Sequence, residues 1–227
     1  MMEDEAVFSV LSKCFAPVER AEWRHIVQGA AWSDFLDGAR RLLQDDGIFG
    51  LTSAPLARAH KRCPLQEFLS AGEVNALFSP PTFEEKNAFA ARHFTGGLSE
   101  SVVPVESLYA VWSANPRTET PFSQAKGLYC GDAARYMGAL VDSLGLQVPS
   151  TFSAYPDHVS LELDLVAVLL RSGMHDEACQ FFVERFEWLT AYRTQLLALQ
   201  DDARFYIGLV DVLLGIRAQV GTVEMNA

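Results

Sequence analysis

Apolar residues recur along most of the chain at intervals of three and four positions, which is the period of an α-helix with one buried face. The first such stripe precedes Pro17, which is expected to end its helix. The members of this stripe are Val7, Leu11, Cys14 and Phe15. A second helical stretch is expected from about Glu19 to the turn at Asp45-Asp46-Gly47, where Gly47 would be the left-handed C-terminal residue.

The same period predicts helices along the rest of the chain, at about 65–71, 73–78, 82–94, 122–144, 157–172, 175–187, 188–199 and 201–219. Thr82, followed by Glu84 and Glu85, has the pattern of a helix N-cap with acidic first-turn residues. Residues 105–113 are expected to form a short helix or turn. Gly145 is expected to end the helix predicted at about 122–144. No stretch of convincing length alternates with the period of a β-strand. The predicted fold class is therefore all-α, a bundle of about ten helices.

The uncharged, extended segment 146–155 is the best candidate for a boundary between two helical units, with the polar loop 115–121 as the alternative. We therefore predict an N-terminal helical subdomain over 1–148, a hinge loop over 149–156 and a C-terminal helical subdomain over 157–227. Two units joined by a hinge can exchange between chains, so both a monomer and a domain-swapped dimer are compatible with this organisation.

The charge of the chain restricts its partners. The 227 residues carry a formal net charge of -11, with a sequence pI near 4.9. Such a surface repels phosphate backbones, so nucleic acid and anionic membrane are not expected partners, whereas a basic peptide segment is. Asp164 and Arg171 interrupt the best apolar run, so no integral membrane segment is expected. The acidic N-terminus lacks the basic start of a secretory signal, and we predict a cytoplasmic protein.

Motifs that would indicate catalysis are missing from the sequence. Gly96-Gly97 lacks the following lysine of a phosphate-binding loop, and neither Gly-x-Ser-x-Gly nor His-Glu-x-x-His occurs. The four widely spaced cysteines include no Cys-x-x-Cys pair, which argues against a zinc cluster. We therefore expect no enzymatic activity, no metal and no cofactor.

The stretch that begins with Tyr155-Pro156 is a polar and aromatic loop that leads directly into an apolar helix. Asp157 stands where a helix N-cap is expected, and His158 and Glu162 are four residues apart on one helical face. These three residues have three interpretations. The first is a capped helix in which Glu162 fixes the ring of His158. The second is a binding site, and the third is an acid–base or metal-binding pair.

Two aromatic segments accompany this loop. In the segment that starts at Pro104, Tyr109 and Trp112 are three residues apart and are predicted to share a helical face, either in the core or as one wall of a peptide groove. The aromatic stripe over 181–189 has helical spacing and is predicted to belong to the core.

Taken together, these segments resemble the TorD/DmsD/NarJ family of redox-enzyme maturation chaperones. The family signature is Asp-His followed by an apolar helix with Glu-Leu, which is matched by Asp157-His158 and Glu162-Leu163. Further family patterns are matched by Pro104 to Tyr109 with Glu106 and Ser107, by Gly131-Asp132, by Gly145-Leu146 and by Trp188-Leu189. The resemblance spans roughly residues 100–200. The family usually has Glu-Pro two residues before the Asp-His, whereas in this chain Pro156 directly precedes Asp157.

The resemblance implies a TorD-like all-α fold and a function without catalysis. Such chaperones bind the twin-arginine signal peptide, or the apo form, of the catalytic subunit of a molybdopterin oxidoreductase, for example one similar to DMSO or TMAO reductase. They hold the subunit in the cytoplasm until its molybdenum cofactor has been inserted. The alternatives are a helical nucleotide-binding or hydrolytic protein that uses His158 and Glu162, and a purely structural adaptor in which the 155–162 loop is packed away.

The expected peptide-binding residues follow from the chemistry of a leader, which has a basic head and an apolar stretch. Asp157 and Glu162 are expected to pair with the leader's arginines, since carboxylate–guanidinium contacts are strong when bidentate. His158 is expected to orient these carboxylates or to add pH sensitivity near neutrality. Tyr109 and Trp112 are expected to pack the apolar part, and Tyr155 and Pro156 of the loop are also expected to bind the peptide. Glu106, Ser107 and Leu163 support the family motif.

Overall fold

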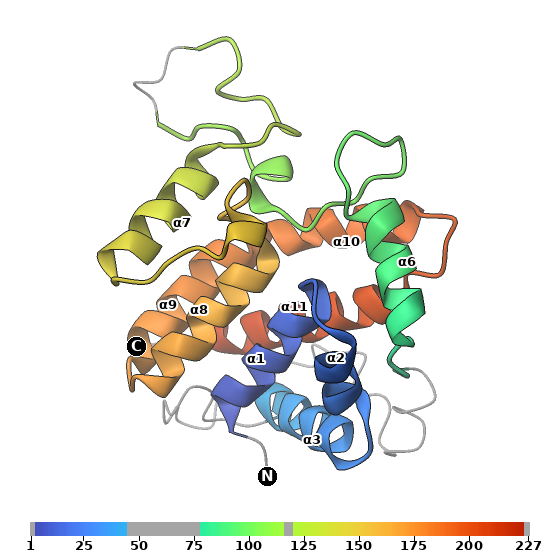
Figure 1. Ribbon diagram of the computed structural model, residues 1–227. Helices are drawn as coiled ribbons and strands as arrows, with labels where there is room; N and C mark the ends of the chain where they lie inside the picture. The colour runs from blue at the N-terminus through green and yellow to red at the C-terminus, as the bar shows by residue number, and fades with distance from the viewer. Residues whose placement is uncertain (1–2, 45–77, 116–119, 225–227) are drawn as a thin grey trace.

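The computed structural model describes residues 3–44, 78–115 and 120–224. Within these ranges the backbone forms α-helices joined by loops and short 3-10 turns (Figure 1). The one β-type contact described is an isolated antiparallel bridge between Val105 and His158. No helix in these ranges is both long and apolar enough to cross a membrane. The predicted all-α class is confirmed.

Nine α-helices and three 3-10 turns are described in these ranges. In chain order the α-helices are α1 (Asp4–Phe15), α2 (Arg20–Val27), α3 (Ala30–Gln44), α6 (Phe83–His93), α7 (Asp132–Ser143), α8 (Val159–Arg171), α9 (His175–Arg185), α10 (Leu189–Ala198) and α11 (Arg204–Glu224). The 3-10 turns are η2 (Glu106–Leu108), η3 (Ser150–Phe152) and η4 (Phe186–Trp188).

The helical stretch expected after Glu19 is wrong in one respect, because it is divided into α2 and α3. Gly29 adopts a φ of +54°, a conformation that glycine reaches without strain, and the chain changes direction there. The Gly47 cap and the helix expected at 65–71 lie outside the described residues, as does the helix expected at 73–78 apart from Phe78.

The helix expected over 122–144 is wrong in its first part, since α7 begins only at Asp132. The residues before it pair with an earlier loop. The carbonyl of Ala125 accepts a hydrogen bond from the N–H of Trp112, and a second bond of this kind joins the neighbouring residues of the two segments. The C-terminal end is as expected, because Gly145 has a φ of +68° and its N–H donates to the carbonyl of Asp142.

Helix α1 lies at the centre of the packing (Figure 1). It packs most extensively against α8, and it also contacts α3, while α11 contacts α3, α9 and α10. Phe8 and Leu11 of α1 and Leu163 and Val166 of α8 have fully buried side chains in one continuous hydrophobic core. The division at the 149–156 loop stays a prediction, and helices from both sides of that loop meet in this core.

Helix α8 is apolar on nearly all sides because it is covered on more than one. It contacts α1 and α9, and its exposed positions include Asp164 and Arg171 near its middle and end. A helix that is hydrophobic around its whole circumference is buried in this way. Its first turn is held as well, since the hydroxyl of Ser12 on α1 donates to the carbonyl of Ser160 at 2.8 Å. The polar residues at the start of α8 are therefore fixed relative to the core.

The N-terminal cap of α6 provides a test of the helix boundaries. Thr82 and Glu85 form a capping box, in which the Glu85 N–H donates to Thr82 Oγ1 at 3.2 Å and the Thr82 N–H donates to the Glu85 carboxylate at 2.8 Å. Replacing Thr82 by alanine leaves a helical N–H without its acceptor, so we expect Thr82→Ala to lower the free energy of unfolding by about 1 kcal/mol in urea titrations.

Thr95→Ala is the matched control for this substitution. Thr95 follows α6 at its other end, and its exposed hydroxyl donates to the Ala91 carbonyl at 3.0 Å. Because surface substitutions of this kind change stability by less than about 0.5 kcal/mol, Thr95→Ala should leave the unfolding curve nearly unchanged. Equal losses in the two variants would contradict the importance of the cap.

Candidate functional site

The two segments that carry the family motif lie side by side. The Glu106 N–H donates to the Asp157 carbonyl at 3.0 Å, and the Val159 N–H donates to the Pro104 carbonyl at 2.9 Å. Together with the bridge between Val105 and His158, these bonds form a short antiparallel pairing. The structure thus brings together residues that are about 50 positions apart in sequence.

Asp157 is buried, with 1% of its surface exposed, and it is not the N-cap of α8. Its carboxylate instead accepts hydrogen bonds from both the N–H (2.8 Å) and the hydroxyl of Ser107. The predicted capping role is wrong because these two donors on the neighbouring segment satisfy the carboxylate. The side chain of Asp157 therefore holds the 104–107 segment against the start of α8.

His158 is the N-cap of α8, because its Nδ1 accepts a hydrogen bond from the Ser160 N–H at 3.1 Å. Its ring packs against Phe152 at 4.8 Å between centroids. Burial lowers the pKa of His158 to about 3, and the positive charge of Lys86 acts in the same direction. The ring is therefore neutral at pH 7, and the predicted pH sensitivity near neutrality is wrong. Ser160, and not Glu162, fixes its orientation.

Glu162 lies in a cluster of charged side chains beneath the paired segments. It is fully buried, and its Oε2 accepts a hydrogen bond from the Trp188 indole N–H at 3.3 Å. Glu106 is also buried beside it, and its Oε2 pairs with the guanidinium of Arg185 at the end of α9. The cluster thus contains two neighbouring carboxyl groups and one arginine.

The surroundings of Glu162 favour the protonated form of its carboxyl group. Burial raises the pKa of Glu162 well above its ordinary value, and the neighbouring carboxylate of Glu106 raises it further. The Oε1 of Glu162 has no hydrogen-bond donor facing it among the described residues. Because two ionised carboxylates cannot donate to each other, a proton on Glu162 that is donated to Glu106 satisfies both groups. Arg185 forms an ion pair with Glu106.

Tyr109 belongs to this buried cluster, whereas Trp112 does not. The ring of Tyr109 stacks on Trp188 at 5.3 Å and 22°, and its hydroxyl donates to the Val103 carbonyl at 3.1 Å. Trp112 is partly exposed. The prediction that Tyr109 and Trp112 share a helical face is wrong, because the 3-10 turn η2 ends at Leu108, before both residues, and no helix covers 109–112. The stripe over 181–189 is in the core as predicted, with Phe182 and Phe186 fully buried.

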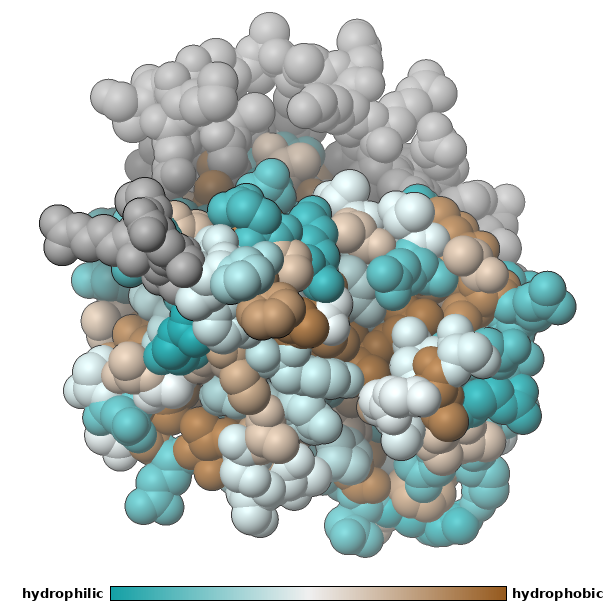
Figure 2. All heavy atoms as spheres, turned by 90° about the horizontal axis from the view of Figure 1, so that it is seen from above, coloured by the Kyte–Doolittle hydropathy of each residue, from teal (hydrophilic) through white to brown (hydrophobic). Residues whose placement is uncertain are grey.

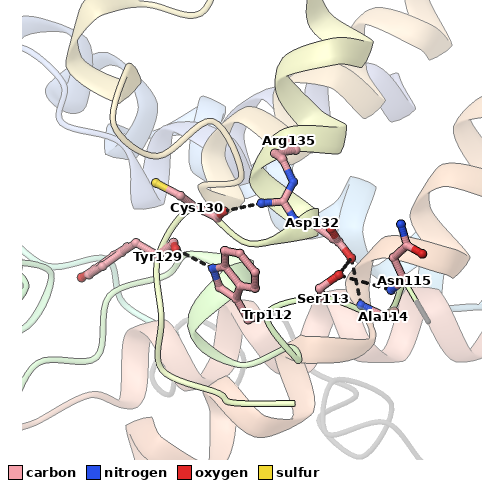
Figure 3. A network of polar contacts seen from close by, with 8 residues as sticks. All are labelled: Trp112, Ser113, Ala114, Asn115, Tyr129, Cys130, Asp132 and Arg135. Atoms are coloured by element: carbon pink, nitrogen blue, oxygen red, sulfur yellow. Dashed lines mark hydrogen bonds and ion pairs between the residues drawn. The ribbon is translucent and has the colours of Figure 1, made fainter. Parts of the chain in front are cut away.

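Trp112 is held by a polar network at the start of α7 (Figure 3). Its indole N–H donates to the Tyr129 carbonyl at 3.2 Å, and the guanidinium of Arg135 lies over its ring at 4.9 Å. The carboxylate of Asp132 accepts from the Ser113 hydroxyl at 2.8 Å and also pairs with Arg135. This network fixes the loop that carries Trp112 to the first turn of α7.

The face that carries the loops before α7 and after α6 mixes hydrophobic and hydrophilic side chains (Figure 2). Tyr155 and Pro156 are partly exposed, and the ring of Tyr155 lies 5.0 Å from that of Tyr129. Phe122 and Leu128, in the loop that pairs with residues 112 and 113, are among the exposed large hydrophobic residues.

The structure thus divides the candidate residues into two groups. The buried group is Glu106, Ser107, Tyr109, Asp157, His158, Glu162 and Leu163. The partly exposed group is Trp112, Tyr155 and Pro156. Since Asp157 and Glu162 are buried, their contact with a partner's arginines stays a prediction that requires a rearrangement to uncover them. In the described ranges no three or more His, Cys, Asp or Glu residues are grouped as metal ligands would be.

Arg185 and Asp132 are functional candidates that the sequence pattern did not reveal. Arg185 is a cation within a strongly aromatic stripe, next to Phe186, and this combination is the signal by which it could have been found. Asp132 belongs to the Gly-Asp family pattern, but nothing in the sequence shows that its carboxylate reaches back to Ser113.

Comparison with known protein families finds a family model that covers the segments described above. A protein-family model described as the nitrate reductase delta subunit matches residues 64–200, more than half of the chain. The matched region includes both paired segments, the charged cluster and α7. No curated protein matches the chain.

The close approach of Gly131 to the Trp112 loop gives a testable prediction. A Cβ at this position would lie 2.8 Å from the Trp112 carbonyl oxygen and 3.5 Å from the Ser107 hydroxyl. Because backbone atoms have to move to admit the methyl group, Gly131→Ala should lower the free energy of unfolding by about 1–3 kcal/mol. Gly138→Ala, in the middle of α7 with no atom within 4 Å of the added carbon, is the control. It should gain up to about 1 kcal/mol from helix propensity, and a loss like that of Gly131→Ala would contradict the steric explanation.

The raised pKa of Glu162 makes stability depend on pH in a defined direction. Between the ordinary carboxyl pKa and the raised pKa of Glu162, the folded state binds more protons than the unfolded state. The free energy of unfolding therefore falls as pH rises, by at most about 1.4 kcal/mol per pH unit for one proton.

Glu162→Gln keeps a donor for Glu106 but does not titrate. We expect its stability relative to the native protein to rise steadily from pH 5 to pH 8 in urea titrations. Glu187→Gln, which changes an exposed carboxylate after α9, is the control and should run parallel to the native protein. Parallel curves for Glu162→Gln would contradict the raised pKa of Glu162.

Proposed function

The chain belongs to the nitrate reductase delta subunit family, whose members are redox-enzyme maturation chaperones, and from this premise we propose that its client is the catalytic subunit of a molybdopterin oxidoreductase. Membership of this family makes the chain a chaperone of molybdoenzyme maturation, and the family is not catalytic. In the proposal the chaperone binds the twin-arginine leader or the apo subunit in the cytoplasm until the molybdenum cofactor has been inserted. The family name favours a nitrate-reductase-like client over the DMSO- or TMAO-reductase-like client expected from the sequence.

The family match is the observation that carries the proposal, and the chemistry of the surface supports it. A leader joins a basic head to an apolar stretch. The chain has a net charge of -11, which attracts basic segments over a distance of about one Debye length and steers their association. The partly exposed aromatic rings at the start of α7 supply the apolar and hydrogen-bonding contacts that peptide grooves use.

We assign different roles to the two groups of candidate residues. Trp112, Tyr155 and Pro156, together with the exposed Leu128, would contact the apolar part of the client directly. Asp157 and His158 would act from inside, because they hold the 104–107 segment and the first turn of α8 in place. Monomer and domain-swapped dimer are both compatible with these roles.

Titration calorimetry with a twin-arginine leader peptide and with the apo catalytic subunit tests the proposal. The native protein should bind at least one of them. Leu128→Ser should weaken binding by about 1 kcal/mol or more, because it removes apolar surface from the contact without touching the core. The absence of heat with every leader and every apo subunit would reject the proposed client.

Leu197→Ser is the matched control. Leu197 is 55% exposed near the C-terminal end of α10, and Leu128 is 37% exposed in the loop before α7. Both substitutions make the same chemical change on an exposed residue, so their stabilities should be similar. Equal loss of client affinity in the two variants would contradict the assigned surface.

A further inference from the structure

Arg185 occupies a place that has the properties of a guanidinium-binding site. Its Nη2 pairs with the carboxylate of Glu106, and its guanidinium carbon lies 4.9 Å from the centre of the Tyr136 ring. Glu162 stands next to Glu106 with its Oε1 aimed at no donor in the described part of the chain. A carboxylate on one side and an aromatic face on the other are the two groups by which proteins bind the arginine of a ligand.

The fit of Arg185 in this place is incomplete. A guanidinium binds a carboxylate most strongly through two parallel N–H groups. Arg193 does so with Asp211, through Nε and Nη2 on the two carboxylate oxygens. Arg185 uses Nη2 alone, and its buried Nε has no partner among the described residues. A guanidinium that approaches from another direction could therefore satisfy more donors than Arg185 does.

The site is reachable from the surface on the side of Tyr136. Tyr136 is 45% exposed and the side chain of Arg185 is 21% exposed, whereas Glu106 and Glu162 lie behind them in the interior. Movement of the Arg185 side chain toward solvent would uncover the carboxyl pair. Removal of Arg185 alone would leave the buried carboxyl pair without a cation, which is energetically costly. An incoming cation would therefore have to bind as Arg185 leaves.

We propose that Glu106, Glu162 and Tyr136 form a guanidinium-binding site that Arg185 occupies in the free protein and that an arginine of the client takes over on binding. That the incoming arginine comes from a leader rests on the proposed function, whereas the affinity of the site for a guanidinium group does not. The exchange gives the interior Glu162 a route to a client arginine. It also lowers the apparent affinity for the client, because the site is competent only in the fraction of molecules from which Arg185 is displaced.

A small-molecule rescue tests the site without any client. Arg185→Ala should lower the Tm, and millimolar N-ethylguanidinium should restore part of the loss, because it supplies the missing planar cation. Ethylammonium, which lacks the planar set of N–H donors of a guanidinium, should restore less of the lost Tm. The double variant Arg185→Ala with Glu106→Gln removes the carboxylate and should show no rescue. Equal effects of N-ethylguanidinium on the single and the double variant would overturn the proposal.

Peptide titration tests the exchange. Arg185→Ala should bind a twin-arginine leader about tenfold more tightly than the native protein, which corresponds to about 1.4 kcal/mol. A leader with both arginines changed to glutamine should lose this gain. Arg193→Ala, which removes the partly buried Arg193–Asp211 ion pair between α10 and α11, should leave the affinity unchanged. An unchanged or lower affinity of folded Arg185→Ala for the arginine leader would overturn the proposal.

The outcomes for the site and for the client are distinguishable. Rescue by N-ethylguanidinium with no leader binding in any variant would keep the guanidinium site and reject the proposed client. If Arg185→Ala does not fold, NMR of the native protein decides, with the Nε resonances of Arg185 and Arg193 followed during leader addition. A change confined to Arg185 supports the exchange, and no change at Arg185 despite binding overturns it.

Discussion

The buried carboxylate of Asp157 and the two donors of Ser107 form the contact on which the rest of this structure depends. A buried carboxyl group is tolerated in the interior only while its hydrogen bonds are complete. The contact therefore fixes the 104–107 segment to the start of α8. Because α8 packs against both α1 and α9, the position of the core helices follows from this pairing. His158 completes it by capping α8 with a neutral ring.

The charged cluster next to this contact links the fold to the function. Glu106 belongs to the paired segment, Glu162 to α8 and Arg185 to α9, so three elements meet in this cluster. Trp188 and Tyr109 close the cluster with stacked rings. An interior that already accommodates a guanidinium between carboxyl and aromatic groups has the chemistry that a client with arginines requires. In the proposed exchange the same groups stabilise the free protein and bind an arginine of its client.

The Trp112 network extends this arrangement to the surface. Asp132 and Arg135 tie the first turn of α7 to the loop that carries Trp112, and Gly131 permits the close approach of the two backbones. Tyr136, one turn further along α7, is thereby placed over Arg185. The positions of the partly exposed rings and of the interior carboxyl pair are consequently fixed relative to each other. This arrangement suits the proposed client, which carries both apolar and basic groups.

Much of this protein follows from its sequence alone. The helical class, the cap at Thr82 and the burial of the 181–189 stripe follow from apolar periodicity and local hydrogen bonding, which act between residues a few positions apart. The order of Asp157, His158 and Glu162 likewise indicated the family. The tertiary structure alone decided that Asp157 bonds Ser107 instead of capping α8, that α7 begins at Asp132, and that Arg185 lies between Glu106 and Tyr136. These outcomes depend on donors and acceptors from distant segments, and a local pattern contains no information about which distant group will satisfy a buried charge.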